Sequence, residues 1–106
     1  MAPGAQLGEL EYLLMLAVLR LEGEGSAQQI RELLKKKADR SVSRGTLYAT
    51  LDRLVRKSYL TWETEDVTPE RGGIPRRLFA LTAAGRKAVV RSSRAISRLS
   101  EGLTLP

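Results

Sequence analysis

Two carboxylates, Glu63 and Glu65, stand two residues apart, a spacing that places a possible general acid and general base on one face of a strand. The chain has no histidine and no cysteine, which excludes thiol nucleophiles, disulfides, Ser-His triads and His- or Cys-ligated metal sites. Because these glutamates stand close to several arginines, we expect them to be exposed or paired with Arg77. The sequence therefore predicts no enzyme, no cofactor and no metal.

A second set of residues suits the reading of base edges in duplex DNA. Small residues on the outer side of a helix allow close approach to the major groove, and hydroxyl and guanidinium groups can hydrogen-bond to bases and phosphates. For Tyr48 the alternative is core packing, and for Arg53 it is a solvated helix face. The residues of this segment that we predict to contact DNA are Ser43, Arg44, Gly45, Thr46, Tyr48, Ala49 and Arg53.

Three arginines, Arg71, Arg76 and Arg77, lie in and beside a segment that contains two glycines and two prolines. Such a segment predicts a turn-rich loop. Arginines on a loop of this kind can reach backbone phosphates or the minor groove. We therefore add these three to the predicted DNA contacts.

The overall charge agrees with a polyanionic partner. Eighteen Lys and Arg against twelve Asp and Glu give a formal net charge of +6 and an isoelectric point near 10.2. Residues 1–25 carry one arginine against four glutamates, whereas residues 83–106 carry five Lys or Arg and one glutamate. The sequence thus predicts a polyanion-binding surface that leaves out the first helix.

Periodicity predicts the elements that position these residues. Apolar residues at helical spacing indicate helices over 8–21, 27–37, 44–58 and 83–101, with Ser26, Ser43 and Thr82 as N-caps for the last three. Between them the period changes to two, which predicts strands over 60–65 and 77–81. Trp62 on the first strand is expected to have a structural role.

This order predicts a mostly α fold with a small β-hairpin (α+β): a winged helix-turn-helix followed by a C-terminal dimerisation helix. We expect residues 1–82 to form the DNA-binding domain, with 1–6 as a flexible tail. Residues 83–106 would supply the dimerisation helix as part of the same compact unit.

The first and last helices predict a homodimer. The first is apolar around most of its circumference, and a chain of 106 residues can hardly cover such a helix completely. The alternative is a central core helix in a monomer. The last helix carries a short heptad-like apolar stripe. The predicted interface residues are Leu10, Leu13, Leu14, Val89, Ile96 and Leu99.

Three segments together resemble the PadR-like winged-helix transcriptional regulators: residues 7–14, Ser43–Leu51 with its Ser-x-Gly-Thr-Leu-Tyr pattern, and residues 77–86 with Leu-Thr-x-x-Gly-Arg. The resemblance covers roughly residues 7–90 and is closest to the small subtype that ends after one long helix. It implies a prokaryotic repressor that dimerises through its first and last helices. The family's turn after the third helix usually has Gly where this chain has Ser58. Small-molecule-sensing members stack planar ligands on interface aromatics, and residues 83–106 contain none.

The predicted function is a sequence-specific, duplex-DNA-binding transcriptional regulator that represses as a homodimer on a palindromic operator. One alternative is a winged-helix protein–protein interaction module, and another is a basic RNA-associated protein. A small-molecule effector of unknown identity stays open. The longest apolar stretch, Tyr12–Leu19, is too short to span a membrane, and the N-terminus lacks a secretory signal, so we expect a cytoplasmic protein.

Overall fold

The computed structural model describes residues 7–65 and 75–105 and contains four helices and a hairpin. The helices are α1 (Glu9–Arg20), α2 (Ala27–Ala38), α3 (Arg44–Arg56) and α4 (Ala83–Ser100). Strands β1 (Leu60–Thr64) and β2 (Arg77–Leu81) precede α4. The predicted winged helix-turn-helix is confirmed, with helix ends within two residues of those expected. The predicted tail 1–6 and Arg71 lie outside the described residues.

Three helices begin where the sequence places their caps. The side chains of Ser26, Ser43 and Thr82 accept hydrogen bonds from the backbone N–H groups of Gln29, Thr46 and Gly85. These bonds satisfy N–H groups that the first turn of a helix leaves without a partner. Each helix start is therefore fixed by local chemistry.

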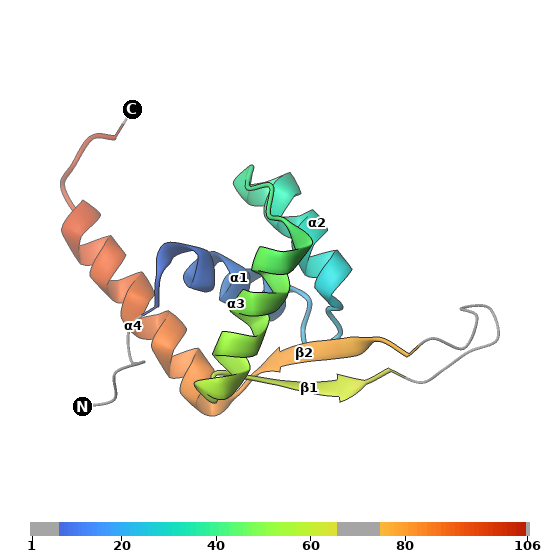
Figure 1. Ribbon diagram of the computed structural model, residues 1–106. Coiled ribbons are helices and arrows are strands. Elements are labelled where there is room, and N and C mark those ends of the chain that lie inside the picture. The colour runs from blue at the N-terminus through green and yellow to red at the C-terminus, as the bar shows by residue number, and fades with distance from the viewer. Residues whose placement is uncertain (1–6, 66–74, 106) are drawn as a thin grey trace.

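The hairpin forms the wing, which extends from the helical body on the side opposite to α4 (Figure 1). Strands β1 and β2 are antiparallel, with Leu60 opposite Leu81, Trp62 opposite Phe79 and Thr64 opposite Arg77. The backbone N–H of Phe79 also donates to the carbonyl of Gly25, which joins β2 to the segment before α2. The wing is thus attached to the body along its inner end.

The core lies between the helices and the inner end of the wing. Its completely buried side chains include Leu14, Met15 and Val18 of α1, Ile30 of α2, and Leu54 of α3. Helix α1 therefore packs one side into the core of its own chain. Ala17 is also buried, and the remaining apolar residues of α1, including Leu10 and Leu13, are half-buried.

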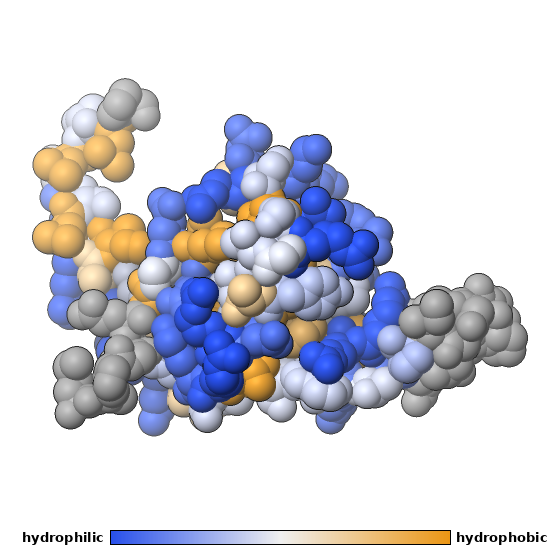
Figure 2. Space-filling model, viewed as in Figure 1, coloured by the Kyte–Doolittle hydropathy of each residue, from blue (hydrophilic) through white to orange (hydrophobic). Residues whose placement is uncertain are grey.

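Helix α4 leaves the body and exposes apolar side chains in its second half. Space-filling colours show hydrophobic surface gathered over the end of α4 and the segment that follows it (Figure 2). The exposed residues there are Ile96, Leu99, Leu103 and Leu105. Among the residues described, no helix is both long and apolar enough to cross a membrane.

Candidate nucleic-acid interface

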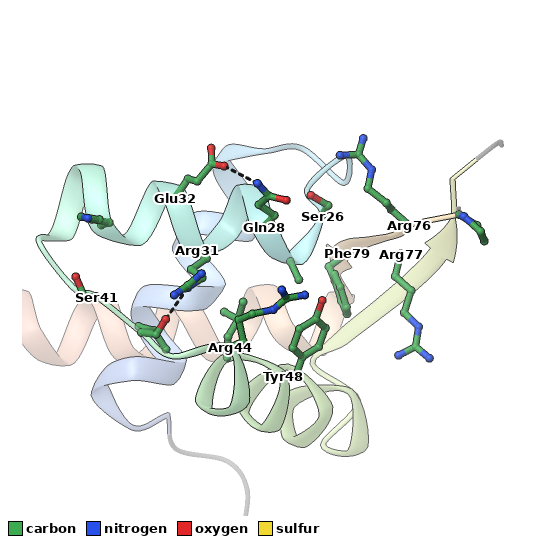
Figure 3. A pocket seen from close by; sticks show the side chains of 15 residues that line it. Ser26, Gln28, Arg31, Glu32, Ser41, Arg44, Tyr48, Arg76, Arg77 and Phe79 are labelled. Atoms are coloured by element: carbon green, nitrogen blue, oxygen red, sulfur yellow. Dashed lines mark hydrogen bonds between the residues drawn. The ribbon is translucent and has the colours of Figure 1, made fainter. Parts of the chain in front are cut away.

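A groove of about 740 Å³ lies between α2, the start of α3 and β2 (Figure 3). Its acidic lining, within the described ranges, is Glu32, whose carboxylate accepts a hydrogen bond from Gln28. The cationic side chains that line it are Arg31, Lys35, Arg44, Arg76 and Arg77. The groove is therefore strongly basic, as a surface for phosphates must be.

Helix α3 turns one face to the core and the other to this groove and to solvent. Leu47, Leu51 and Leu54 are buried, whereas Arg44 and Tyr48 point into the groove (Figure 3). Tyr48 is 43% exposed, so the alternative of core packing is wrong for its side chain. All seven residues that the sequence selected between 43 and 53 lie on the exposed side of α3 or at its cap.

Ser43, a predicted DNA contact, also caps the start of α3. Its hydroxyl oxygen accepts from the Thr46 backbone N–H at 3.1 Å, and the hydroxyl donates to Thr46 Oγ1 at 3.0 Å. Thr46 therefore stands at the exposed start of α3 with its side chain held in one orientation.

Gly45 stands in open space. A Cβ atom added there would meet no atom within 4 Å, so the fold itself does not require glycine at this position. Gly85, the glycine of the Leu-Thr-x-x-Gly-Arg pattern, is the opposite case. A Cβ there would lie 2.2 Å from the carbonyl oxygen of Tyr59. The first glycine faces outward, and the second is required by packing.

Two cationic residues of helix α2, Arg31 and Lys35, belong to the groove and were missed by the sequence interpretation. Arg31 Nε donates to the carbonyl of Val42 at 2.7 Å, which fixes the turn before α3 (Figure 3). Their spacing of four residues, which places them on one helix face, was the available signal.

Glu11 is a buried carboxylate that the sequence interpretation also missed. Its Oε1 accepts from the Gly8 N–H, and its Oε2 lies 2.9 Å from Lys57 Nζ and 3.7 Å from Arg53 Nη1. Arg53, a predicted DNA contact, is therefore also part of an ion-pair network inside the chain. A glutamate three residues after a helix cap often accepts the cap N–H, and that spacing was the signal.

The surroundings of Glu11 favour its charged form. Burial raises the pKa of its carboxyl, but the hydrogen bonds from Gly8 and Lys57 and the positive charges of Lys57 and Arg53 outweigh burial. The pKa of Glu11 therefore lies below its ordinary value, and its carboxylate is ionised at neutral pH.

The wing arginines pair differently from the prediction. Glu65 forms its ion pair with Arg76 at 2.9 Å, whereas Arg77 lies over the ring of Trp62. The expected pairing of Glu65 with Arg77 is wrong because these two residues lie on opposite faces of the hairpin. Glu63 is exposed on β1, and within the residues described no three His, Cys, Asp or Glu side chains gather as metal ligands.

The predicted interface residues fall into two groups. Leu14 and Val89 are buried in the core of their own chain, so their assignment to a dimer interface is corrected. Leu10 and Leu13 are half-buried against the core, and Ile96 and Leu99 are 52% and 81% exposed. Leu14 and Val89 face the core because α1 and the first turns of α4 both pack against the helical body.

Comparison with known proteins identifies the family. The family model described as "Transcriptional regulator PadR-like family" matches residues 15–91. A PadR-like transcription factor from Bacteroides fragilis has 33% identical residues and a TM-score of 0.72, and the match covers 87% of this chain and 84% of that one. No curated protein matches the sequence.

Two solved structures with lower identity share the fold. F93 from STIV, a winged-helix DNA-binding protein, is 21% identical with a TM-score of 0.68, over 93% of this chain and 100% of that one. Bacillus subtilis PadR, solved in complex with operator DNA, is 19% identical with a TM-score of 0.64, over 92% of this chain and 50% of that one. The chain therefore belongs to the PadR-like family of transcriptional regulators and is a DNA-binding transcriptional regulator with a winged-helix fold.

Proposed function

We propose that this regulator is a repressor that binds a palindromic duplex operator as a homodimer in the cytoplasm. Residues 1–82 would form the DNA-binding domain and residues 83–106 the dimerisation helix. In this arrangement α3 enters the major groove, and Arg77 of the wing contacts the backbone of the same half-site. Two bound copies would occlude a promoter.

The observation that carries this proposal is the orientation of α3. Its apolar face is committed to the core, while Arg44, Thr46 and Tyr48 stand on the exposed side at its N-terminal end. The first turns of recognition helices contact base edges in this way. Gly45 and Ala49 are also exposed there, and their small size favours close approach to the groove floor.

The charge of the groove supports contact with the backbone. Arg31 and Lys35 approach from α2, Arg44 from α3, and Arg77 from the wing. Cations on three elements around one helix can contact phosphates on both sides of a major groove. Bacillus subtilis PadR, which has the same fold, was solved with operator DNA, and this supports a duplex as the partner.

Dimerisation is supported by the exposed apolar residues at the end of α4. Ile96 and Leu99 are three positions apart and so lie on one side of the helix. Large apolar side chains exposed together on a projecting helix indicate a protein contact. In a two-fold dimer, two α3 helices would read half-sites roughly 34 Å apart, or a multiple of that distance.

Selection of bound duplexes from a random pool tests the proposal. We expect a palindrome whose half-sites are separated by about one duplex turn. A pool that gives no enrichment, or tighter binding to single-stranded RNA than to duplex DNA, would contradict it. An enriched site without two-fold symmetry would contradict the dimer but not DNA binding.

Base reading is then tested with two variants of α3. Thr46→Ala and Tyr48→Ala should each weaken binding to the selected site by roughly 10-fold, since a good base contact is worth about 1–3 kcal/mol. Binding to random duplex should change little. Ser97→Ala, on the exposed side of α4, is the matched control. Equal losses on both duplexes would place the base-reading surface elsewhere.

A further inference from the structure

Two neighbouring arginines at the base of the wing, Arg76 and Arg77, have different partners. Arg76 donates from Nε and Nη2 to the two carboxylate oxygens of Glu65, at 2.9 and 3.0 Å. The guanidinium carbon of Arg77 lies 4.3 Å from the centroid of the Trp62 ring. Successive strand residues point to opposite faces, so the two arginines are held on opposite sides of the hairpin.

These partners leave the two guanidinium groups with different capacities to bind a phosphate. The carboxylate of Glu65 neutralises Arg76 and uses two of its five N–H donors. Arg77 instead lies over the Trp62 ring, and a cation–π contact does not require the N–H donors that a carboxylate would use. Within the described part of the chain, Arg77 has no carboxylate partner and keeps its positive charge.

Trp62, the one tryptophan of the chain, is more exposed than the aromatic residue opposite it. Its direct cross-strand neighbour Phe79 is buried, whereas Trp62 itself is 38% exposed. Arg77 is paired with Thr64, so it stands diagonally across from Trp62 on the same face, within reach of a long side chain. The exposed ring area of Trp62 thus serves as a platform for one cation.

We propose that Trp62 is a positioning residue for DNA binding. It orients Arg77 to bind a backbone phosphate of the DNA, whereas the ion pair with Glu65 keeps Arg76 from making such a contact. This inference rests on the proposed function. Arg77 lines the same groove as Arg44 and Tyr48, so a duplex seated against α3 would lie next to it. An arginine already held on a ring loses less conformational freedom when it binds.

A double-mutant cycle tests the coupling between the two residues. Arg77→Gln should weaken binding to the selected duplex about 5- to 10-fold and reduce the salt slope by about one contact. Trp62→Leu should weaken it roughly 2- to 5-fold, the range of an exposed cation–π contact. The double variant should bind as Arg77→Gln does, because Trp62 acts only through Arg77. Losses that multiply would overturn the proposal.

Two matched variants exclude simpler explanations. Trp62→Phe keeps a ring face and should bind within about 2-fold of the unmodified protein; a loss as large as that of Trp62→Leu would indicate a role other than stacking. Arg76→Gln changes the net charge by the same amount as Arg77→Gln, yet should leave the salt slope nearly unchanged. An equal slope change in both would mean that only overall charge matters.

The proposed function and this inference fail in different ways. If the unmodified protein binds no duplex, both are overturned. If it binds tightly but Trp62→Leu has no effect on affinity or salt slope, only the positioning role is overturned. Circular dichroism of every variant confirms that the helices, and thus α3, are retained.

Discussion

The Glu11 carboxylate near the start of α1 accepts a 2.9 Å hydrogen bond from the Lys57 ammonium at the end of α3. These residues are 46 positions apart in the chain, so the contact joins α1 directly to α3, the proposed recognition helix. Arg53 reinforces it from the preceding turn of α3. The helix that carries the proposed base-reading surface is therefore attached to α1 at its C-terminal end by an ionic contact with a buried carboxylate.

This contact predicts a pH-dependent stability. A carboxyl whose pKa is lower in the folded protein contributes stability that is present above its unfolded pKa, near 4.5, and is lost as the pH falls through the folded value. Glu11→Gln should reduce the free energy of unfolding at pH 7 by about 1–3 kcal/mol, because Lys57 loses its charged partner. It should also reduce the loss of stability below pH 4.5. Denaturant unfolding between pH 3 and 7 measures both.

Glu9 provides the control on the same helical turn. Its carboxylate pairs with Arg40 at 2.6 Å but is 78% exposed. Exposed pairs contribute less than about 1 kcal/mol, so Glu9→Gln should change stability little at any pH. Equal effects of the two substitutions would show that burial does not matter at Glu11.

The two glycines of α3 and α4 predict opposite responses to alanine. Gly85→Ala should destabilise the fold by roughly 1–3 kcal/mol, because its Cβ would overlap the Tyr59 carbonyl. Gly45→Ala should stabilise it by about 0.5–1 kcal/mol through helix propensity. If α3 enters the major groove, Gly45→Ala should nevertheless weaken DNA binding. Thermal unfolding and duplex affinity together check this; tighter or unchanged binding would contradict close approach at Gly45.

Ser58 occupies a position that favours glycine. It has a φ of 64°, and its N–H and that of Tyr59 donate to the carbonyls of Val55 and Leu54, which closes the end of α3 in a Schellman motif. An L-residue in this conformation costs about 1–2 kcal/mol, partly offset by the greater freedom of an unfolded glycine. Ser58→Gly should therefore stabilise the fold by about 0.5–1 kcal/mol.

Thermal unfolding again measures the effect, and Ser93→Gly serves as the control. Ser93 lies inside α4 and is exposed, where glycine should cost roughly 0.5 kcal/mol. The same chemical change should thus have opposite signs at the two positions. A destabilised Ser58→Gly variant would show that the left-handed turn is not a source of strain.

The exposed end of α4 predicts where dimerisation can be broken. Leu99→Asp should convert the proposed dimer to a monomer at micromolar concentration, because a charge would be buried in the apolar contact. Ser97→Asp introduces the same charge at another exposed position of α4 and should leave the dimer intact. Light scattering distinguishes the two states. A monomeric unmodified protein, or a dimeric Leu99→Asp variant, would contradict this interface.

Much of the fold was predictable because it depends on neighbouring residues. Ser26, Ser43 and Thr82 mark helix starts since each cap bonds to an N–H three residues ahead. The buried and exposed faces of α3 followed from helical periodicity, and the exposed position of Thr46 followed with them, whereas periodicity left Tyr48 open between core packing and exposure. The family resemblance is confirmed by the match over residues 15–91, which contains two of the three segments that carry it, Ser43–Leu51 and residues 77–86.

The tertiary structure alone decided which charges meet and which apolar residues turn inward. The loop between the strands does not specify their register, so only the observed pairing shows that Glu65 meets Arg76 and that Arg77 meets Trp62. Packing against the same body buries Leu14 and Val89 but leaves Leu99 exposed. Local chemistry thus determined the elements of this regulator, whereas contacts between distant residues determined how its DNA-binding surface is held.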